Sequence, residues 1–214
     1  CMKKVVNIFL SVFGGIFILL GVIAIYNTVF WNVEHIIWFS NIMLILIGYG
    51  LLARNSLLIS SCVNIIAIPN TFWTLDFFYY LIFGKGLFGL IDYFFEPGWL
   101  LINKIVSIQH VTIIPLAIIS LYFLKVKRKD SWKLSLILTS IIFFMTRLFT
   151  SPEGNINCVY KSCLQIGFPE AVYPFVWFAI TFLMIFTTNF ILTNLKFLRF
   201  KKNKNLAFKN FHNN

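Results

Sequence analysis

The sequence predicts an all-α protein, a polytopic bundle of about six transmembrane helices. Three observations support this fold class. Of the 214 residues, 59% are hydrophobic and only 12% are charged, whereas soluble domains have about 25% charged residues. The apolar residues occur in runs of about 20, the length that an α-helix needs to cross a bilayer. The basic residues lie mostly in short clusters just outside these runs.

Six apolar runs are long enough to be spans, and we expect residues 1–200 to form a single membrane domain. The first run follows Lys3 and Lys4. It is longer than the apolar part of a secretory signal and has no small-residue cleavage site, so we expect an uncleaved span. Residues 201–214 are basic and rich in Asn, which predicts a disordered cytoplasmic tail. The predicted spans are 5–30, 35–53, 56–80, 104–124, 132–150 and 171–195.

Residues 84–102 are also apolar, but we do not expect them to form a seventh span. Glycines, Asp92, Glu96 and the pair Pro97-Gly98 interrupt the segment. A span here would also place the cluster KVKRK (125–129) on the side of the membrane opposite Lys3 and Lys4. We therefore predict a short interfacial helix or re-entrant segment at the outer surface.

The distribution of charge predicts that both termini are cytoplasmic. In this orientation four basic residues are outside, which leaves 14 of the 18 inside. The charge flanks spans and forms no stripe of the kind that binds nucleic acid, so we expect membrane lipids as partners and no nucleic acid. The sequence therefore predicts a multi-pass protein of the inner membrane. The four outer basic residues are Lys85, Lys104, Arg147 and Lys161.

With this orientation, the ionisable residues in or beside the spans gather at the outer end of the bundle. Asp76 lies in the outer part of the third span, and His110 lies about 10 Å into the fourth span at the helical rise. Ionisable residues inside spans are energetically costly and usually mark function, so we expect Asp76 and His110 to be catalytic. The residues expected to add binding contacts are Asp92, Arg147, His35, Asn70 and Asn157.

Several of these residues also have a structural interpretation. His35 and Arg147 are close enough to the interface to reach water, and Asp76 could form an ion pair with Arg147. Asn64 and Asn70 could simply provide hydrogen bonds between helices.

One chemistry that fits these residues is that of a hydrolase or acyltransferase. His110 would be the general base and a hydroxyl group the nucleophile, with Ser107, Thr71 or Thr74 as the candidate. No GxSxG motif identifies the nucleophile. Six spans with a histidine in the fourth resemble the layout of the androgen-induced membrane hydrolases, without a shared motif.

A metal site would need ligands from three different spans, namely His35, Asp76 and His110. Imidazole and carboxylate are adequate ligands for zinc and several other metals. However, neither HExxH nor any other close ligand spacing occurs. We therefore predict no metal site, and the sequence identifies no cofactor.

Cys158 and Cys163 lie in one polar loop on the predicted outer side. In an oxidising compartment they could form a small disulfide loop, and the alternative is two free thiols. Because the spacing is not CxxC, it gives little support for a thiol oxidoreductase.

Five segments together resemble an uncharacterised family of prokaryotic six-span membrane proteins. The resemblance covers most of the chain from the second to the sixth span. It implies a six-span bundle, directs attention to the segments that carry Asp76, Asp92, His110 and Asn157, and implies no activity. The segments are WFSNIMLILIGYGLL (38–52), PNTFWTLDFF (69–78), GLFGLIDYFFEP (86–97), SIQHVTIIPL (107–116) and SPEGNINCVY (151–160).

Three functional classes follow from these patterns. The leading hypothesis is a membrane-embedded enzyme of the hydrolase or acyl-transfer type, acting on a lipid or other amphipathic substrate from a polar site in the outer leaflet. The first alternative is a non-catalytic membrane scaffold or interaction protein. The second is a small-solute transporter, which should continue its polar residues into the inner half of the bundle, where the sequence has few ionisable residues.

Overall fold

The described part of the chain, residues 2–164 and 166–199 without the side chains of residues 30 and 31, is built from helices joined by turns and loops. The structure is a computed structural model. The tail predicted to be disordered, 201–214, lies outside the described residues. The helices are α1 (Met2–Trp31), η1 (Val33–Ile37), α2 (Phe39–Leu52), α3 (Ser56–Phe83), α4 (Asp92–Phe95), α5 (Leu101–Ser107), α6 (Gln109–Leu124), α7 (Ser131–Phe149), η2 (Ile156–Cys158) and α8 (Tyr173–Asn194).

Five helical stretches in the described part are long and apolar enough to cross a membrane: α1, α3, α5 with α6, α7 and α8. The remaining predicted span, 35–53, forms the end of η1 and the shorter α2, whose 14 residues extend about 21 Å at the helical rise. Length and composition therefore identify five of the six predicted spans, and the protein has the all-helical architecture expected of a membrane protein.

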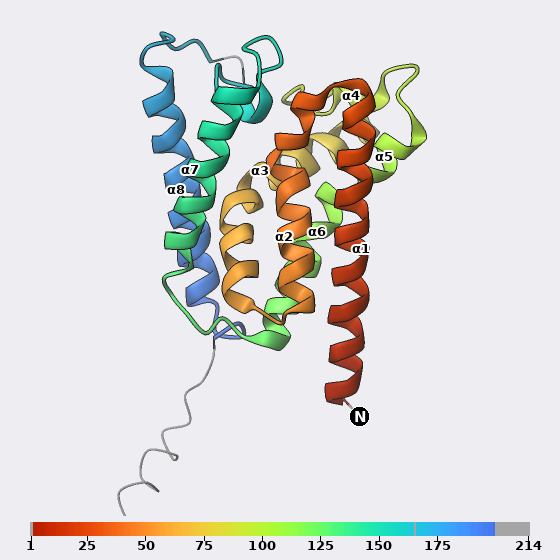
Figure 1. Cartoon of the computed structure of the whole chain (residues 1–214), viewed down its shortest axis with the longest axis vertical. Coiled ribbons are helices and arrows are strands. Elements are labelled where there is room, and N and C mark those ends of the chain that lie inside the picture. Colours follow the sequence, from red (N-terminus) through yellow and green to blue (C-terminus); the bar gives the residue numbers. More distant parts are fainter. Residues whose placement is uncertain (1, 165, 200–214) are drawn as a thin grey trace, which may run out of the picture.

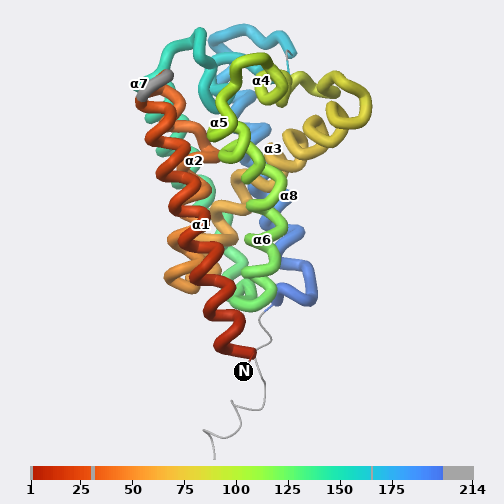
Figure 2. The backbone as a smooth tube through the Cα atoms, turned by 90° about the vertical axis from the view of Figure 1, so that its right-hand side faces the viewer, coloured from red at the N-terminus to blue at the C-terminus, as the bar shows by residue number. Residues whose placement is uncertain are grey.

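The long helices run side by side along one axis (Figure 1). Both ends of the described chain lie at one end of the bundle. The segment between α3 and α5 and the loop between α7 and α8 cover the other end, which we call the loop end (Figures 1 and 2). The segment at 84–102 forms turns, the single helical turn α4, and the start of α5. It therefore lies across the loop end and does not cross the bundle.

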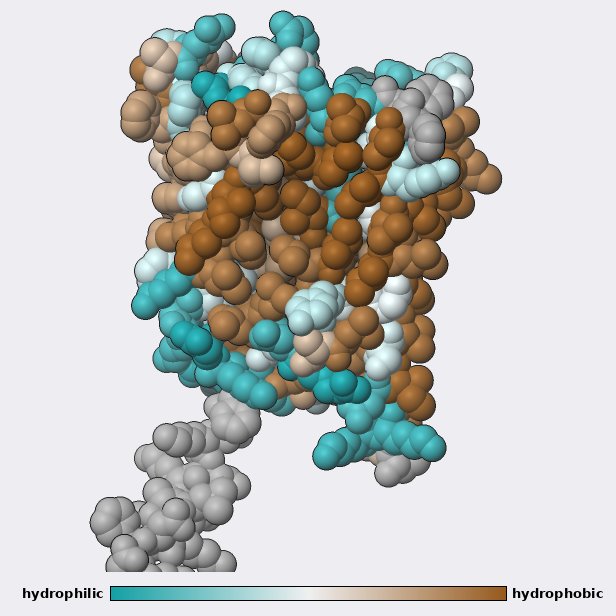
Figure 3. All heavy atoms as spheres, viewed as in Figure 1, coloured by the Kyte–Doolittle hydropathy of each residue, from teal (hydrophilic) through white to brown (hydrophobic). Residues whose placement is uncertain are grey.

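The side of the bundle is apolar between two polar ends. On the face drawn in Figure 3, a broad hydrophobic band crosses the middle, with hydrophilic residues concentrated above and below it. Large apolar side chains such as Leu75, Phe144 and Leu183 are more than half exposed. Contiguous apolar surface of this extent is unfavourable in water, and it is the surface that lipid chains would cover.

Local signals in the sequence set the ends of α3. The Asn55 side chain accepts hydrogen bonds from the backbone N–H groups of Leu57 and Leu58, as a helix N-cap does. At the other end Gly84 adopts a left-handed conformation with φ of 70°, which glycine reaches without steric cost. These two residues turn the chain at opposite ends of the bundle.

The α1 and α2 helices approach closely at two glycines. A Cβ atom at Gly14 would lie 2.9 Å from the carbonyl oxygen of Gly48, and one at Gly48 would lie 2.8 Å from that of Gly14. Small residues at such a crossing allow helix backbones to pack against each other, as is common in membrane helix pairs. The contact holds the long α1 against the buried α2.

Hydroxyl and amide side chains join α3, α7 and α8 in the half of the bundle away from the loop end. Asn64 donates to the hydroxyls of Ser131 and Ser135 and to Asn189 Oδ1, and Ser61 donates to the backbone carbonyl of Ser131. All five side chains are buried. This network provides the interhelical hydrogen bonding that was one interpretation of Asn64.

We expect Gly14→Ala to destabilise the protein by about 1–3 kcal/mol, because the added methyl group would overlap backbone atoms of α2. Thermal unfolding of the purified protein in detergent, followed by circular dichroism, measures the change. Gly15→Ala is the matched control. No atom lies within 4 Å of a Cβ atom at Gly15, so that substitution should stabilise the helix by about 0.5–1 kcal/mol. Equal effects of the two substitutions would contradict the close contact.

Candidate functional site

The imidazole of His110 lies at the loop end, in the first turn of α6 after a short break in the helix at Ile108. It stacks on the indole of Trp73, with ring centroids 4.7 Å apart and an interplanar angle of 22°. Its Nδ1 atom lies 2.9 Å from the backbone carbonyl oxygen of Ser107. The Gln109 amide nitrogen lies 3.0 Å from Nδ1 and 3.4 Å from Nε2. Because a carbonyl can only accept, we assign the proton to Nδ1, and in this tautomer Nε2 is the basic nitrogen.

Neighbouring polar groups extend this site to five side chains, which we call the His110 cluster: Trp73, Tyr93, Ser107, Gln109 and His110. The indole N–H of Trp73 donates to the Tyr93 hydroxyl at 3.0 Å, and that hydroxyl also hydrogen-bonds Ser107. Burial raises the pKa of Tyr93, against the opposing effect of these two hydrogen bonds. The phenol therefore stays neutral at physiological pH and can both donate and accept.

The His110 cluster has hydrogen-bonding capacity that the described protein atoms leave unused. Gln109 is 2% exposed, and its Oε1 atom has no partner among the described residues. The Nε1 atom of Trp99, whose ring packs edge-on against Tyr93, also has none. Asn70, predicted as a binding residue, lies one helical turn before Thr74 and has an unpartnered Nδ2 atom. Unpaired buried polar atoms cost about 1–3 kcal/mol each, so these atoms are favourable places for a polar ligand to bond.

Asp76, the second predicted catalytic residue, has a different environment. Its carboxylate is fully buried. One oxygen accepts from the backbone N–H groups of Leu87 and Phe88, and the other accepts from that of Leu90. The carboxylate therefore anchors the turn that follows α3, and its hydrogen bonds go to this turn and not to His110.

Glycine makes this turn around Asp76 possible. Gly84 and Gly89 have φ of 70° and 71°, a conformation that L-residues rarely adopt. A Cβ atom at Gly86 would lie 3.3 Å from Asp76 Oδ1 and 2.8 Å from Asp92 Oδ1. The carboxylates of Asp76 and Asp92 thus lie close to the same glycine, and Asp92 is exposed to solvent.

The remaining predicted site residues lie in a second group, around η1, η2 and the end of α7. Asn157 accepts from the backbone N–H of Phe39 and donates to the Ile37 carbonyl and to Thr146 Oγ1. The exposed guanidinium of Arg147 lies 4.6 Å from the Tyr160 ring centroid. His35 belongs to η1, with its ring 6.2 Å from that of Trp38.

The structure therefore separates the predicted site residues into two groups. His110, Asp76, Asp92 and Asn70 belong to α3, α6 and the connection between α3 and α5. The suggested pair of Asp76 with Arg147 does not form, since the ion pair found among the described residues is Arg128 with Asp130. No group of three or more His, Cys, Asp or Glu residues in the described part could hold a metal ion.

Cys158 and Cys163 are bonded as a disulfide, with an S–S distance of 1.97 Å and Cα atoms 5.6 Å apart. The loop they close is held by Asn155, whose Oδ1 accepts from the backbone N–H groups of Tyr160 and Lys161. The Tyr173 hydroxyl donates to the Cys158 carbonyl. The bridge thus stiffens the loop that Asn157 ties to α2 and α7.

Sequence reasoning missed Trp73, Tyr93 and Gln109. The first is one turn before Asp76 on α3, and the last is next to His110, so proximity in sequence could have suggested both. Tyr93 is 20 residues from Trp73. It lies in the segment GLFGLIDYFFEP (86–97), but no local pattern indicates that its hydroxyl meets Trp73.

Comparison of the chain with family models, curated proteins and solved structures finds no match. The resemblance to a family of six-span membrane proteins therefore stays a prediction.

We expect Asp76→Asn to destabilise the protein by about 2 kcal/mol. The Asn side chain has the same shape as Asp, but its amide N–H group would face backbone N–H groups that now donate to the carboxylate. Hydrogen bonds to a charged acceptor are worth about 1.5–3 kcal/mol. Thermal unfolding in detergent measures the loss, and hydrogen exchange should show faster exchange in residues 84–91. Asp92→Asn is the matched control and should change both readouts little, because this carboxylate is exposed. Similar effects of the two substitutions would contradict the anchoring role.

Proposed function

We propose that the protein is a multi-pass protein of the inner membrane that crosses the bilayer six times, with both termini in the cytoplasm. Two observations support this placement. Both ends of the described chain lie at the same end of the bundle (Figure 1). That end also carries Lys3, Lys4, Arg54, Lys127 and Arg128, and basic residues favour the cytoplasmic side.

In this proposal η1 and α2 together form the second of the six spans. At the usual rises of the two helix types they extend about 30 Å, close to the thickness of the hydrocarbon core. Asn41 in α2 donates to the His35 carbonyl, and Asn157 bonds the backbone at Ile37 and Phe39. These hydrogen bonds pair backbone N–H and C=O groups at the junction of the two helices, where lipid would offer no partner.

Cysteine labelling tests the orientation. We expect Glu153→Cys to react with a membrane-impermeant maleimide in intact cells, and Lys127→Cys to react only after the membrane is permeabilised. Both side chains are exposed. Every variant also carries Cys1→Ser, and the chain with that change alone gives the background, because Cys62 is buried and Cys158 is bonded to Cys163. Labelling of Lys127→Cys in intact cells would rule out the proposed orientation.

We infer further that the His110 cluster binds the polar part of a lipid or other amphipathic substrate and that His110 acts there as a general base. The observation that carries this proposal is the fixed imidazole. Its ring stacks on Trp73 and its Nδ1 lies 2.9 Å from the Ser107 carbonyl oxygen, and with the proton assigned to Nδ1 the basic atom is Nε2. A histidine whose ring is held in this way is suited to accept a proton at Nε2.

We propose water as the nucleophile in place of Ser107, Thr71 and Thr74, because each of these hydroxyls already has a hydrogen-bond partner. The hydroxyls of Thr71 and Thr74 donate to the carbonyl oxygens of Ala67 and His110, and that of Ser107 bonds Tyr93. In the proposed hydrolysis His110 Nε2 takes a proton from water. The water oxygen bonds to the acyl carbon of the substrate, the ester C–O bond breaks, and the leaving oxygen takes the proton back from the imidazolium.

Asp76 has a positioning role in this scheme. It accepts hydrogen bonds from the turn at 87–90, which leads into α4 and Tyr93. The carboxylate thereby fixes the segment that supplies the phenol of the His110 cluster. Its oxygens already have three backbone donors, so proton transfer is assigned to His110 alone.

Lipid profiling of a deletion strain tests the catalytic role. We expect the deletion to change the abundance of at least one lipid or amphipathic metabolite, and the native gene to reverse that change. His110→Asn should fail to reverse it while the protein accumulates in the membrane at its normal level. His35→Asn is the control and should complement fully, since His35 belongs to the second group of residues. Full complementation by His110→Asn would leave the non-catalytic scaffold as the better interpretation.

A further inference from the structure

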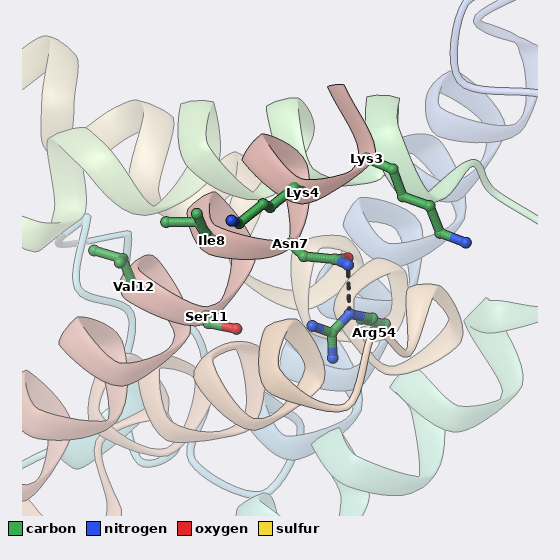
Figure 4. A pocket seen from close by; sticks show the side chains of 7 residues that line it. All are labelled: Lys3, Lys4, Asn7, Ile8, Ser11, Val12 and Arg54. Carbon is green, nitrogen blue, oxygen red and sulfur yellow. Dashed lines mark hydrogen bonds between the residues drawn. The ribbon is translucent and has the colours of Figure 1, made fainter. Parts of the chain in front are cut away.

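The cytoplasmic end of the bundle has a hollow of about 620 Å³ between the first turns of α1 and the turn that joins α2 to α3 (Figure 4). Three basic residues border it: Lys3, Lys4 and Arg54. No acidic residue is among those that line it. The hollow is therefore a site of concentrated positive charge, suited to an anion.

Arg54 is held in place within this hollow. Its Nε–H donates to Asn7 Oδ1 at 3.2 Å across the hollow (Figure 4), and its Nη1 donates to the Leu52 carbonyl at 3.1 Å. These two contacts leave the Nη2 group without a hydrogen-bond partner among the described residues. A guanidinium fixed in this way loses little entropy when it binds a phosphate oxygen.

Arg54 has a backbone conformation that glycine usually adopts. The residue has φ of 52° and follows the C-cap of α2, where the N–H groups of Arg54 and Asn55 bond the carbonyls of Leu51 and Gly50. Glycine is strongly preferred at this position, and other residues adopt it at a cost of about 1–2 kcal/mol. Arginine at this position therefore points to a use for its side chain.

The hollow is basic at one end and apolar at the other. Ile8 and Val12 also line it and are 54% and 50% exposed. Ile16 and Leu19 continue this exposed apolar stripe along α1, toward the middle of the bundle. An occupant that complements both parts has a negative headgroup attached to hydrocarbon chains.

A second hollow on the other side of Arg54 is a weaker candidate. It holds Lys127 and Arg128, but Arg128 already donates twice to Asp130. This exposed pair lowers the pKa of Asp130, chiefly through the hydrogen bond from Arg128. Part of the positive charge there is thus neutralised, whereas Lys3, Lys4 and Arg54 form no ion pair within the described part of the chain.

We propose that the hollow between α1 and the α2–α3 turn binds the headgroup of an anionic phospholipid from the cytoplasmic leaflet. Arg54 and the two lysines contact the phosphate, and Ile8 and Val12 contact the acyl chains. This inference rests on the proposed membrane placement and is independent of His110.

Lipid titration of the purified protein in detergent, read by native mass spectrometry, tests this site. We expect phosphatidylglycerol to bind more tightly than phosphatidylcholine. Arg54→Gly should weaken phosphatidylglycerol binding about fivefold, the usual effect of one basic residue at an anionic membrane surface. The same substitution should not lower the unfolding temperature, because glycine suits the left-handed backbone. Asn7→Ala keeps the charge but frees the guanidinium, and should weaken binding about twofold.

Lys125→Gly is the matched control. It removes one positive charge from another residue of positive φ at the end of a helix, outside this hollow, and should leave binding unchanged. Equal weakening by Lys125→Gly and Arg54→Gly would overturn the proposal in favour of non-specific attraction. So would equal affinity for the two lipids, or displacement of phosphatidylglycerol by an equal concentration of inorganic phosphate. His110→Asn should keep lipid binding, which separates a failure of this proposal from a failure of the proposed catalysis.

Discussion

The buried carboxylate of Asp76 organises the loop end of the molecule. A charge without solvent is tolerated only when hydrogen-bond donors surround it, and here three backbone N–H groups from one turn provide them. The same bonds satisfy backbone groups that lipid or packed side chains could not. From this turn the chain continues into α4, where Tyr93 meets Trp73 and, through it, His110.

Asn157 and Asn64 also provide hydrogen-bond partners for polar groups inside the bundle. The amide of Asn157 bonds backbone groups at Ile37 and Phe39, between η1 and α2. Asn64 joins α3 to α7 and α8 through hydroxyl and amide partners. In a bundle with an apolar exterior, each of these side chains fixes the position of neighbouring elements by satisfying polar groups internally. Polarity inside the bundle is thus mainly structural. In the described part, buried polar atoms without a partner lie near His110, at Gln109, Trp99 and Asn70, and also away from it, at Asn27, Asn64 and Thr139.

The two ends of the bundle suit different chemistry. At the loop end, the His110 imidazole stacks on Trp73, which in turn hydrogen-bonds Tyr93, and this is where we propose proton transfer. At the opposite end, Arg54 is held by Asn7 in a hollow with two lysines, which suits retention of an anion. The proposed orientation places the first site toward the outer leaflet and the second toward the cytoplasm, so one lipid-facing protein could engage both leaflets.

By itself, the sequence determined the helical class and the approximate helix positions. Long apolar runs and residues such as Asn55 and Gly84 act locally, through burial and capping. It also drew attention to Asp76 and His110, because ionisable residues stand out in apolar runs. Only the tertiary structure decided what these two residues contact. Asp76 binds a turn that follows its own helix, and His110 packs on Trp73 from another helix. Such contacts depend on how helices pack and how the 84–102 segment turns, which local pattern does not specify.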